Sequence, residues 1–256
     1  RFITQIGIEN RLLDTPAVRT MCNKPKEFFS KNFLITMVSN IVYLLNVKTT
    51  KRMLNRFDEF AEHHTIRTKQ YKGYKDINSN PPQADFYITG SDQVFSVRSS
   101  KKQIRMLNFG DKNVPRFSYA ASLGEYDWSD SEKKLFRQYI RNFNCVSVRE
   151  KDAKEYLEPI IERDCFVHLD PVFLLDSDEW SAIESTLNFR EPYILCYPLI
   201  SNVKMQDTID LLKEKTGLKV ICVQTLPLKR IKADKYIFDA GPIEFLGLIK
   251  NAEYVV

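Results

Sequence analysis

The chain has 256 residues, of which 43% are hydrophobic and 28% charged, with 8 Gly and 11 Pro. This composition excludes a collagen, a low-complexity disordered protein and a disulfide scaffold, and the length suffices for one large or two small domains. The net charge is +5, and the basic residues are scattered in short runs. We interpret these runs as solvated surface rather than a nucleic-acid-binding patch; a small substrate rich in phosphate or carboxylate is the alternative.

The cysteines and histidines show none of the spacings that build a metal site. No CxxC pair occurs, and an odd cysteine count without a pattern indicates a reducing compartment. Four of the five cysteines stand in apolar runs typical of strands, where a free thiol packs as a small hydrophobic group. We therefore predict no metal site. The residues concerned are Cys22, Cys145, Cys165, Cys196, Cys222, His63, His64 and His168.

The first predicted elements are helical. Residues 32–47 carry no charge but are fewer than the roughly 20 apolar residues needed to span a bilayer. They predict a buried or partner-facing helix, which offers a surface for a second copy of the chain, with contact to a membrane surface as the alternative. Residues 51–64 place apolar side chains on one helical face, and the Gly, Asn and Pro content of residues 72–83 predicts a loop.

Short apolar strands then alternate with helices. We predict strands at residues 84–89, 117–121, 145–148 and 165–169, and an amphipathic helix at 131–143 with Asp130 as its N-cap. Another helix begins directly after the third strand. This alternation predicts an α/β fold, with mostly parallel sheets covered by helices on both faces.

A second set of strands and helices follows an acidic segment at residues 176–180. Strands are predicted at residues 193–197 and 219–224, helices at 205–215 and 243–250, and a further strand begins at 253. We expect an N-terminal domain of residues 1–180, with a helical N-terminal segment, and an incomplete C-terminal domain of residues 181–256. The sequence lacks an initiator Met and stops inside a strand, so we expect it to be a piece of a longer chain.

Polar residues follow the predicted strands of the first domain. Ligands of open parallel sheets bind beyond the carboxyl ends of the strands, where this chain places an arginine, carboxylates, hydroxyls and glycine-flanked amides. Such groups suit a small anion, although each of them alone is also explained as a cap, a turn or a surface ion pair. No Walker loop, GxGxxG turn, GxSxG elbow or HExxH helix is present. The segments are Gly90-Ser91-Asp92-Gln93, Ser122-Leu123-Gly124, Arg149-Glu150 and Asp170-Pro171.

Five motifs in this order make the chain resemble the polysaccharide pyruvyl transferase family over about residues 50–256. The resemblance implies two Rossmann-like domains facing across a cleft, the GT-B architecture, of which the second is truncated here. In the family, the strand matching Tyr254-Val255-Val256 continues into a Ser-Phe-His-Gly-like motif. The motifs are DFYITGSDQVF (85–95), SYAASLG (118–124), VSVREKDA (146–153), LDPVFLL (169–175) and GPIEFLGLIKNAEYVV (241–256).

The reaction that the resemblance implies moves pyruvate from phosphoenolpyruvate, as the donor substrate, onto one or two hydroxyls of a sugar, without a cofactor. It also implies synthesis of an exopolysaccharide or capsule in the bacterial cytoplasm, with peripheral association at the inner face of the membrane. A GT-B glycosyltransferase using nucleotide sugars and a non-catalytic glycan-binding subunit are the alternatives.

The same resemblance implies roles for the residues at the strand ends. Arg149 would clamp the carboxylate or phosphate of the donor, and Asp92 would orient or deprotonate the acceptor hydroxyl. Glu150 would orient Arg149 or serve as a second carboxylate. Gly241 opens a helix whose N-terminus could face an anion. The remaining substrate-binding candidates are Gly90, Ser91, Gln93 and Ser122.

Overall fold

The computed structural model describes residues 33–183, 189, 191–198, 203–224 and 231–256. Contacts between Cα atoms divide these residues into two compact units. We call residues 67–176 the first unit, and residues 33–66 with 177–256 the second unit. The sequence-based division counted residues 33–66 with the N-terminal domain, whereas their contacts group them with residues 177–256.

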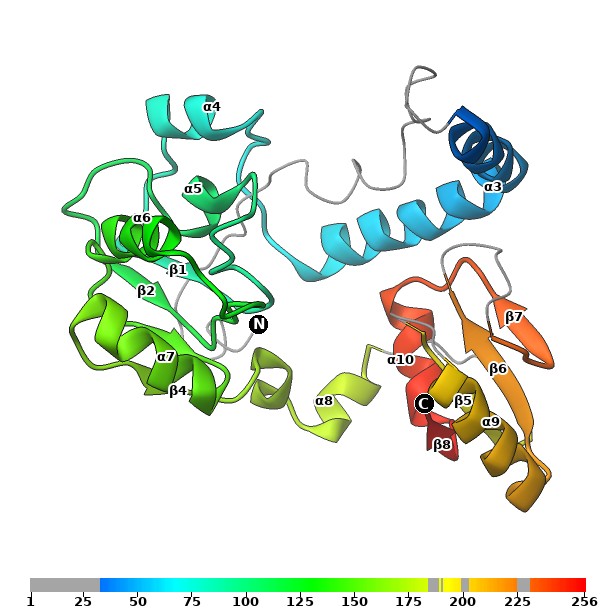
Figure 1. Cartoon of the computed structure of the whole chain (residues 1–256). Helices are drawn as coiled ribbons and strands as arrows, with labels where there is room; N and C mark the ends of the chain where they lie inside the picture. The colour runs from blue at the N-terminus through cyan, green and yellow to red at the C-terminus, as the bar shows by residue number, and fades with distance from the viewer. Residues whose placement is uncertain (1–32, 184–188, 190, 199–202, 225–230) are drawn as a thin grey trace. The chain divides into compact units, whose positions relative to one another are not determined.

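The first unit is built on four short parallel strands (Figure 1). β1 (Tyr87–Thr89) pairs with β2 (Arg116–Ser118), and β3 (Ser147–Val148) pairs with β4 (Phe166–Val167). Two parallel bridges, Phe117 to Cys145 and Ala121 to Val148, connect β2 to β3. The predicted parallel arrangement is confirmed, with strands shorter than expected.

Helices α6 (Asp130–Ile140) and α7 (Lys151–Ile161) contact each other, and α7 also contacts β3 and β4. Phe136 from α6 and Leu157 from α7 are fully buried in one core together with Val148. Strand residues alternate between the two faces of a sheet. Ile88 lies between the buried residues Tyr87 and Thr89 of β1 and is exposed on the other face, and both residues of β4 are exposed.

Two local predictions for the first unit are corrected by the structure. The N-cap of α6 is Ser129 and not Asp130, because the Ser129 hydroxyl accepts the Glu132 amide while the Glu132 carboxylate accepts the Ser129 amide. This reciprocal pair is a capping box, which satisfies two amides at once. The loop predicted at residues 72–83 contains a short helix, α4 (Tyr74–Ser79). The remaining short helices of the unit are α5 (Lys102–Arg105) and the 3₁₀ helix η1 (Pro171–Leu174).

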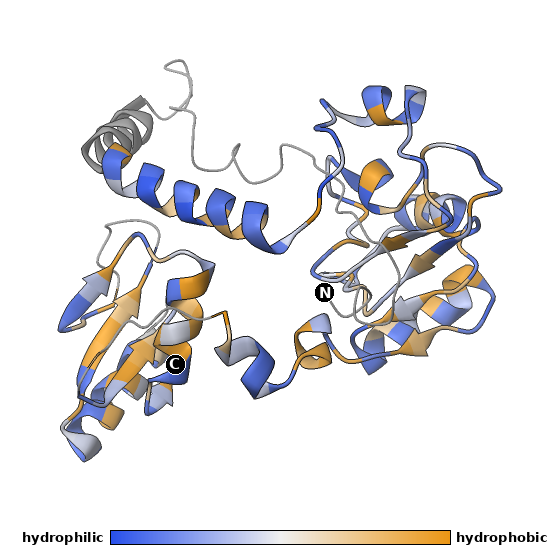
Figure 2. Ribbon diagram, turned by 180° about the vertical axis from the view of Figure 1, so that it is seen from behind, coloured by the Kyte–Doolittle hydropathy of each residue, from blue (hydrophilic) through white to orange (hydrophobic). Residues whose placement is uncertain are grey.

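The second unit contains a parallel sheet in the order β7-β6-β5-β8. Numbered along the chain, this is 3-2-1-4, the order that begins a doubly wound sheet. Figure 2 shows that its central strands are hydrophobic over most of their length. The strands are β5 (Tyr193–Cys196), β6 (Lys219–Val223), β7 (Lys235–Ile237) and β8 (Tyr254–Val255).

Helices cover both faces of this second sheet, as predicted. On one face Ile194 and Cys196 pack with Ile209 of α9 (Val203–Thr216). On the other face Tyr193 and Leu195 pack with Leu248 of α10 (Pro242–Lys250). The alternating burial of β5 therefore comes from two separate cores, one on each side of the strand. A short helix, α8 (Ser177–Ser181), contacts α10.

A single long helix, α3 (Phe33–His64), replaces the two helical segments predicted from the sequence. It contacts α10, and Arg56 forms an ion pair with Glu244 of that helix. The side chains of residues 33–46 lie outside the described residues, so the predicted burial of the uncharged segment stays a prediction. No helix in the described part of the chain has the length and apolar character needed to cross a bilayer.

A buried arginine organises the loop between α5 and β2. The guanidinium of Arg116 donates hydrogen bonds to five backbone carbonyls, and only 2% of the residue is exposed. Burial lowers the pKa of Arg116, and the nearby Tyr87 ring and Asp111 act in the opposite direction. The acceptors are the carbonyls of Leu107, Phe109, Asp111, Lys112 and Val114.

We predict that Arg116→Met lowers the free energy of unfolding by about 3 kcal/mol or more, because the carbonyls of Leu107 and Phe109 lose a buried hydrogen bond from its guanidinium. Urea unfolding would be followed by the fluorescence of Trp128, which is buried in the first unit, in a Trp180→Phe background. The control is Arg141→Met, since Arg141 is exposed. Equal midpoints for the two variants would contradict the prediction.

Candidate active site

Four charged side chains meet at the carboxyl ends of β1, β3 and β4 in the first unit. Arg149 follows β3, and its Nη1 lies 2.7 Å from Oδ2 of Asp170, which follows β4. Its Nε donates to Oε1 of Glu150 at 2.8 Å. Its Nη2 lies 3.6 Å from Oδ1 of Asp92, which follows β1. The sheet thus brings together residues that are far apart in the sequence.

Asp170 is the most strongly held carboxylate of this group. Its Oδ1 accepts the Val172 amide at the start of η1, and its Oδ2 accepts the Ser91 hydroxyl at 3.2 Å in addition to Arg149. Partial burial acts to raise the pKa of Asp170, but the hydrogen bonds from Val172, Arg149 and Ser91 outweigh it and lower the pKa. The sequence analysis noted Asp170 at a strand end without giving it a role; its position there was the available signal.

Arg149 is surrounded by negative charge. The hydrogen bond to Asp170, followed in size of effect by the one to Glu150, raises the pKa of Arg149 above the ordinary value for arginine. One guanidinium therefore faces three carboxylates, of which Asp92 is the most accessible, with 80% of its side chain exposed. Oε2 of Glu150 is buried and has no hydrogen-bond partner within the described residues. This cluster is better matched to neutral or cationic groups than to an isolated anion.

The backbone around the predicted residues is tightly fixed. The Ser122 amide donates to the Ser91 carbonyl at 2.8 Å, and Ser122 is buried, so it contributes here through its main chain. Gln93 has a φ of 48°, in the left-handed region, and Nη1 of Arg105 donates to its carbonyl at 3.3 Å. A Cβ atom added at Gly90 would collide with the Tyr119 carbonyl, so only glycine allows this close approach.

Gly241 lies in the second unit and is not grouped with the other candidates. Its amide donates to Oε2 of Glu244 at 3.0 Å, so the chain supplies its own carboxylate at the N-terminus of α10. An added Cβ at Gly241 would lie 2.5 Å from Cβ of Arg56 and 2.8 Å from Glu244. The role of this glycine in the described residues is thus close packing between α3 and α10.

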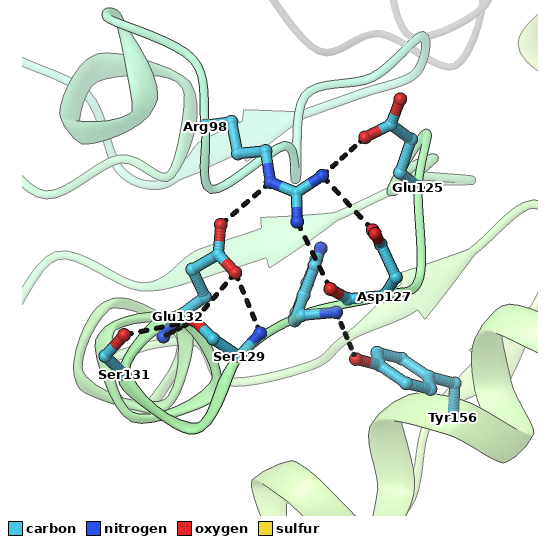
Figure 3. Close-up of polar contacts among 8 residues, drawn as sticks. Arg98, Glu125, Asp127, Ser129, Ser131, Glu132 and Tyr156 are labelled. Atoms are coloured by element: carbon cyan, nitrogen blue, oxygen red, sulfur yellow. Dashed lines mark hydrogen bonds and ion pairs between the residues drawn. The ribbon is translucent and has the colours of Figure 1, made fainter.

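An ion-pair network fixes the loops that follow β1 and β2 to each other (Figure 3). Arg98 donates to Glu125 at 2.6 Å and to Glu132 at 2.8 Å, and lies 3.1 Å from Asp127. Hydrogen bonds from Arg98, which has the largest effect, and from the amide of Ser129 lower the pKa of Glu132 to about 2. The network joins the loop carrying Ser91 to the one carrying Ser122, and so supports the site.

A second polar contact, which the sequence did not predict, involves Ser147 of β3. The Ser147 hydroxyl is 2.6 Å from Nδ1 of His168 and accepts the Ala120 amide at 3.1 Å. The Tyr119 ring stacks on His168, with ring centroids 5.5 Å apart. Tyr119 follows β2 and His168 follows β4, so the contact joins the ends of the strands on either side of β3. No group of three or more His, Cys, Asp or Glu placed to hold a metal ion occurs among the described residues.

Comparison with known proteins identifies the family. The family model for polysaccharide pyruvyl transferase matches residues 18–256. The chain belongs to the polysaccharide pyruvyl transferase family. The resemblance drawn from the five motifs is thereby confirmed, and four of those motifs contribute residues to the cluster around Arg149 or to its supporting backbone. Neither the search of curated proteins nor the search of solved structures found a match.

We predict that Asp170→Asn destabilises the chain by about 1 kcal/mol at pH 7, because a cap and an ion pair are weakened together. The pKa of Asp170 is lowered in the folded state, so its contribution is complete above the unfolded pKa of about 3.9 and is lost as the pH falls through the folded pKa. The difference in unfolding free energy between wild type and variant should therefore shrink between pH 7 and pH 3.

The measurement is urea unfolding of both proteins at each pH. The control is Asp164→Asn, since Asp164 is exposed. A difference that stays constant down to pH 3 would mean that the carboxylate of Asp170 does not stabilise the strand ends by its charge.

Proposed function

We propose that this protein transfers pyruvate from phosphoenolpyruvate to one hydroxyl, or to a pair of hydroxyls, of a surface polysaccharide or its precursor. The observation that carries the proposal is membership of the polysaccharide pyruvyl transferase family across residues 18–256. We propose the cytoplasm as the place of the reaction, since phosphoenolpyruvate is produced there. The GT-B arrangement of the two units is part of the same proposal.

The chemistry needs an acid, a base and a way to hold an anionic donor. The methylene carbon of phosphoenolpyruvate gains a proton, and the adjacent carbon becomes cation-like and bonds to a sugar oxygen. Phosphate leaves with the electron pair of its bond to that carbon. A second sugar hydroxyl then closes the ketal. One hydroxyl proton balances the proton gained by the methyl group, and the other leaves with phosphate.

The cluster in the first unit supplies groups suited to part of this reaction. Asp92 is exposed, and among the described residues its one charged contact is a long ion pair with Arg149, so its oxygens are accessible to a hydroxyl. Ser91 and Gln93 stand beside it in the same fixed loop. Carboxylates near the developing positive centre would also stabilise it electrostatically.

We predict that the wild-type protein releases inorganic phosphate from phosphoenolpyruvate only when a sugar acceptor is present, and that Arg149→Ala loses turnover at least about a hundredfold. The assay would follow phosphate release and pyruvylated product by mass spectrometry, with methyl glycosides of galactose, mannose and glucose as acceptors. Arg141→Ala, an exposed arginine outside the cluster, is the matched control.

One result would count against the proposed reaction and another against the role of Arg149. Turnover of UDP- or GDP-sugars in place of phosphoenolpyruvate would identify a glycosyltransferase. Near-normal turnover in Arg149→Ala would remove that residue from the mechanism while leaving the reaction in place.

A further inference from the structure

A pocket outside the Arg149 cluster lies at the helices α4 and α5 of the first unit. Its volume is about 280 Å³. Small-molecule sites usually measure roughly 300–1,000 Å³, so this pocket suits one small group, such as a single sugar unit. Tyr74 of α4 and Ile104 of α5 pack against the core of the unit and also line the pocket. Its polar lining residues are Lys72, Ser100, Lys101 and Gln103.

The two segments that form the pocket are strongly basic. Residues 67–76 and 100–105 together carry seven lysines and arginines but a single acid, Asp76. Oδ2 of Asp76 accepts the main-chain amide of Lys72 at 2.9 Å, so this carboxylate is engaged by the backbone. The two basic runs are separate in the sequence, and the fold brings them to one pocket. The charge of the pocket therefore favours an anionic ligand.

Lys101 is the partly buried lysine of the pocket. Burial, and to a smaller extent the positive charge of Arg105, lower its pKa, so both act against the charged ammonium. An anionic group in the pocket would offset this cost, because an opposite charge nearby favours the ammonium form. The Ser100 hydroxyl and the Gln103 amide are the neutral donors of the pocket.

The helix α5 joins the pocket to the candidate active site. Nη1 of Arg105 donates to the Gln93 carbonyl at 3.3 Å, and the Thr89 hydroxyl donates to the carbonyl of Arg105 at 2.7 Å. Thr89 ends β1, and Gln93 belongs to the loop that carries Asp92. The pocket and the candidate active site thus share one support, which is the arrangement expected of a subsite for a larger substrate.

We infer that this pocket binds a sugar unit of the acceptor glycan that bears a carboxylate or a phosphate, separate from the unit that receives pyruvate. The inference rests on the proposed function, which makes the glycan the acceptor. The two lysines attract the anionic group, and Ser100 and Gln103 donate to its oxygens. The apolar surface of Tyr74 contacts the carbon face of the sugar ring. No bond forms or breaks here, so the pocket selects the glycan and takes no part in the transfer.

The first test measures binding without the donor, by calorimetric titration of the chain with glucuronate, galacturonate, glucose-1-phosphate and neutral methyl glucoside. At least one anionic sugar should bind wild type about tenfold more tightly than methyl glucoside. Lys101→Gln should weaken that binding about tenfold, through loss of a charge-assisted hydrogen bond. The control is Lys204→Gln, which removes the same charge from an exposed lysine of the second unit.

The anionic sugar that binds identifies the group that the pocket recognises, a carboxylate for the uronates and a phosphate for glucose-1-phosphate. No binding of any anionic sugar, equal affinity for the neutral one, or equal effects of Lys101→Gln and Lys204→Gln would overturn the inference. Binding that is lost in Arg149→Ala but kept in Lys101→Gln would also overturn it, because the anion would then lie in the Arg149 cluster. Lys72 is exposed, so Lys72→Gln should keep the urea midpoint of wild type and provides the same test if Lys101→Gln is destabilised.

The second test separates this inference from the proposed function by measuring phosphate release from phosphoenolpyruvate. If an anionic sugar binds in a Lys101-dependent manner but phosphoenolpyruvate is not turned over with any acceptor, the pocket stands and the pyruvyl donor is wrong. If wild type and Lys101→Gln turn over phosphoenolpyruvate with the same KM for uronate-containing and neutral acceptors, the reaction stands and the pocket is not an acceptor subsite.

Discussion

The contact between Arg149 and Asp170, 2.7 Å long, is the interaction on which the candidate site depends. It joins the end of β3 to the end of β4, and the Ser91 hydroxyl extends the connection to the loop after β1. Without it, the ends of β3 and β4 would be connected only indirectly, through Asp92 and Ser91 of the loop after β1. Asp170 also begins η1, so the same carboxylate fixes the chain on both sides of the contact. One side chain thus sets the positions of groups separated by 79 residues in sequence.

Two arginines of the first unit differ in their hydrogen-bond partners, and therefore in the direction of their pKa shift and in their structural role. Arg116 donates to neutral carbonyls inside the unit, and burial lowers its pKa. Arg149 donates to carboxylates at the surface, which raise its pKa. The guanidinium of Arg116 donates to five carbonyls and so fixes the loop before β2. Arg149 is part-exposed, and within the described residues its Nη2 makes no hydrogen bond and lies 3.6 Å from Asp92. The difference is one of partners and exposure, which residue type alone does not reveal.

The sequence predicted what depends on local pattern. Apolar runs located seven of the eight described strands, and the periodicity of α9 and the Gly-Pro start of α10 placed those helices to within two residues. It missed β7, a three-residue strand, and the helix α4, because tertiary packing decides such short elements. Asp92 and Arg149 could be predicted to meet from the strand-end rule. The pairing of Asp170 with Ser91 could not, since it depends on side-chain directions that only the folded sheet provides.

The charges of the site divide its carboxylates into two kinds. Asp170 uses both oxygens on hydrogen bonds within the protein, and its lowered pKa makes it a weak proton acceptor, so it is suited to positioning. Asp92 holds no such bonds among the described residues and stands exposed beside Nη2 of Arg149. A carboxylate that takes a proton from a hydroxyl must first release the hydrogen bonds that it accepts. Among the described residues, Asp92 accepts fewer hydrogen bonds than Asp170. Asp170 thus fixes Arg149, and Asp92 keeps an accessible carboxylate beside it.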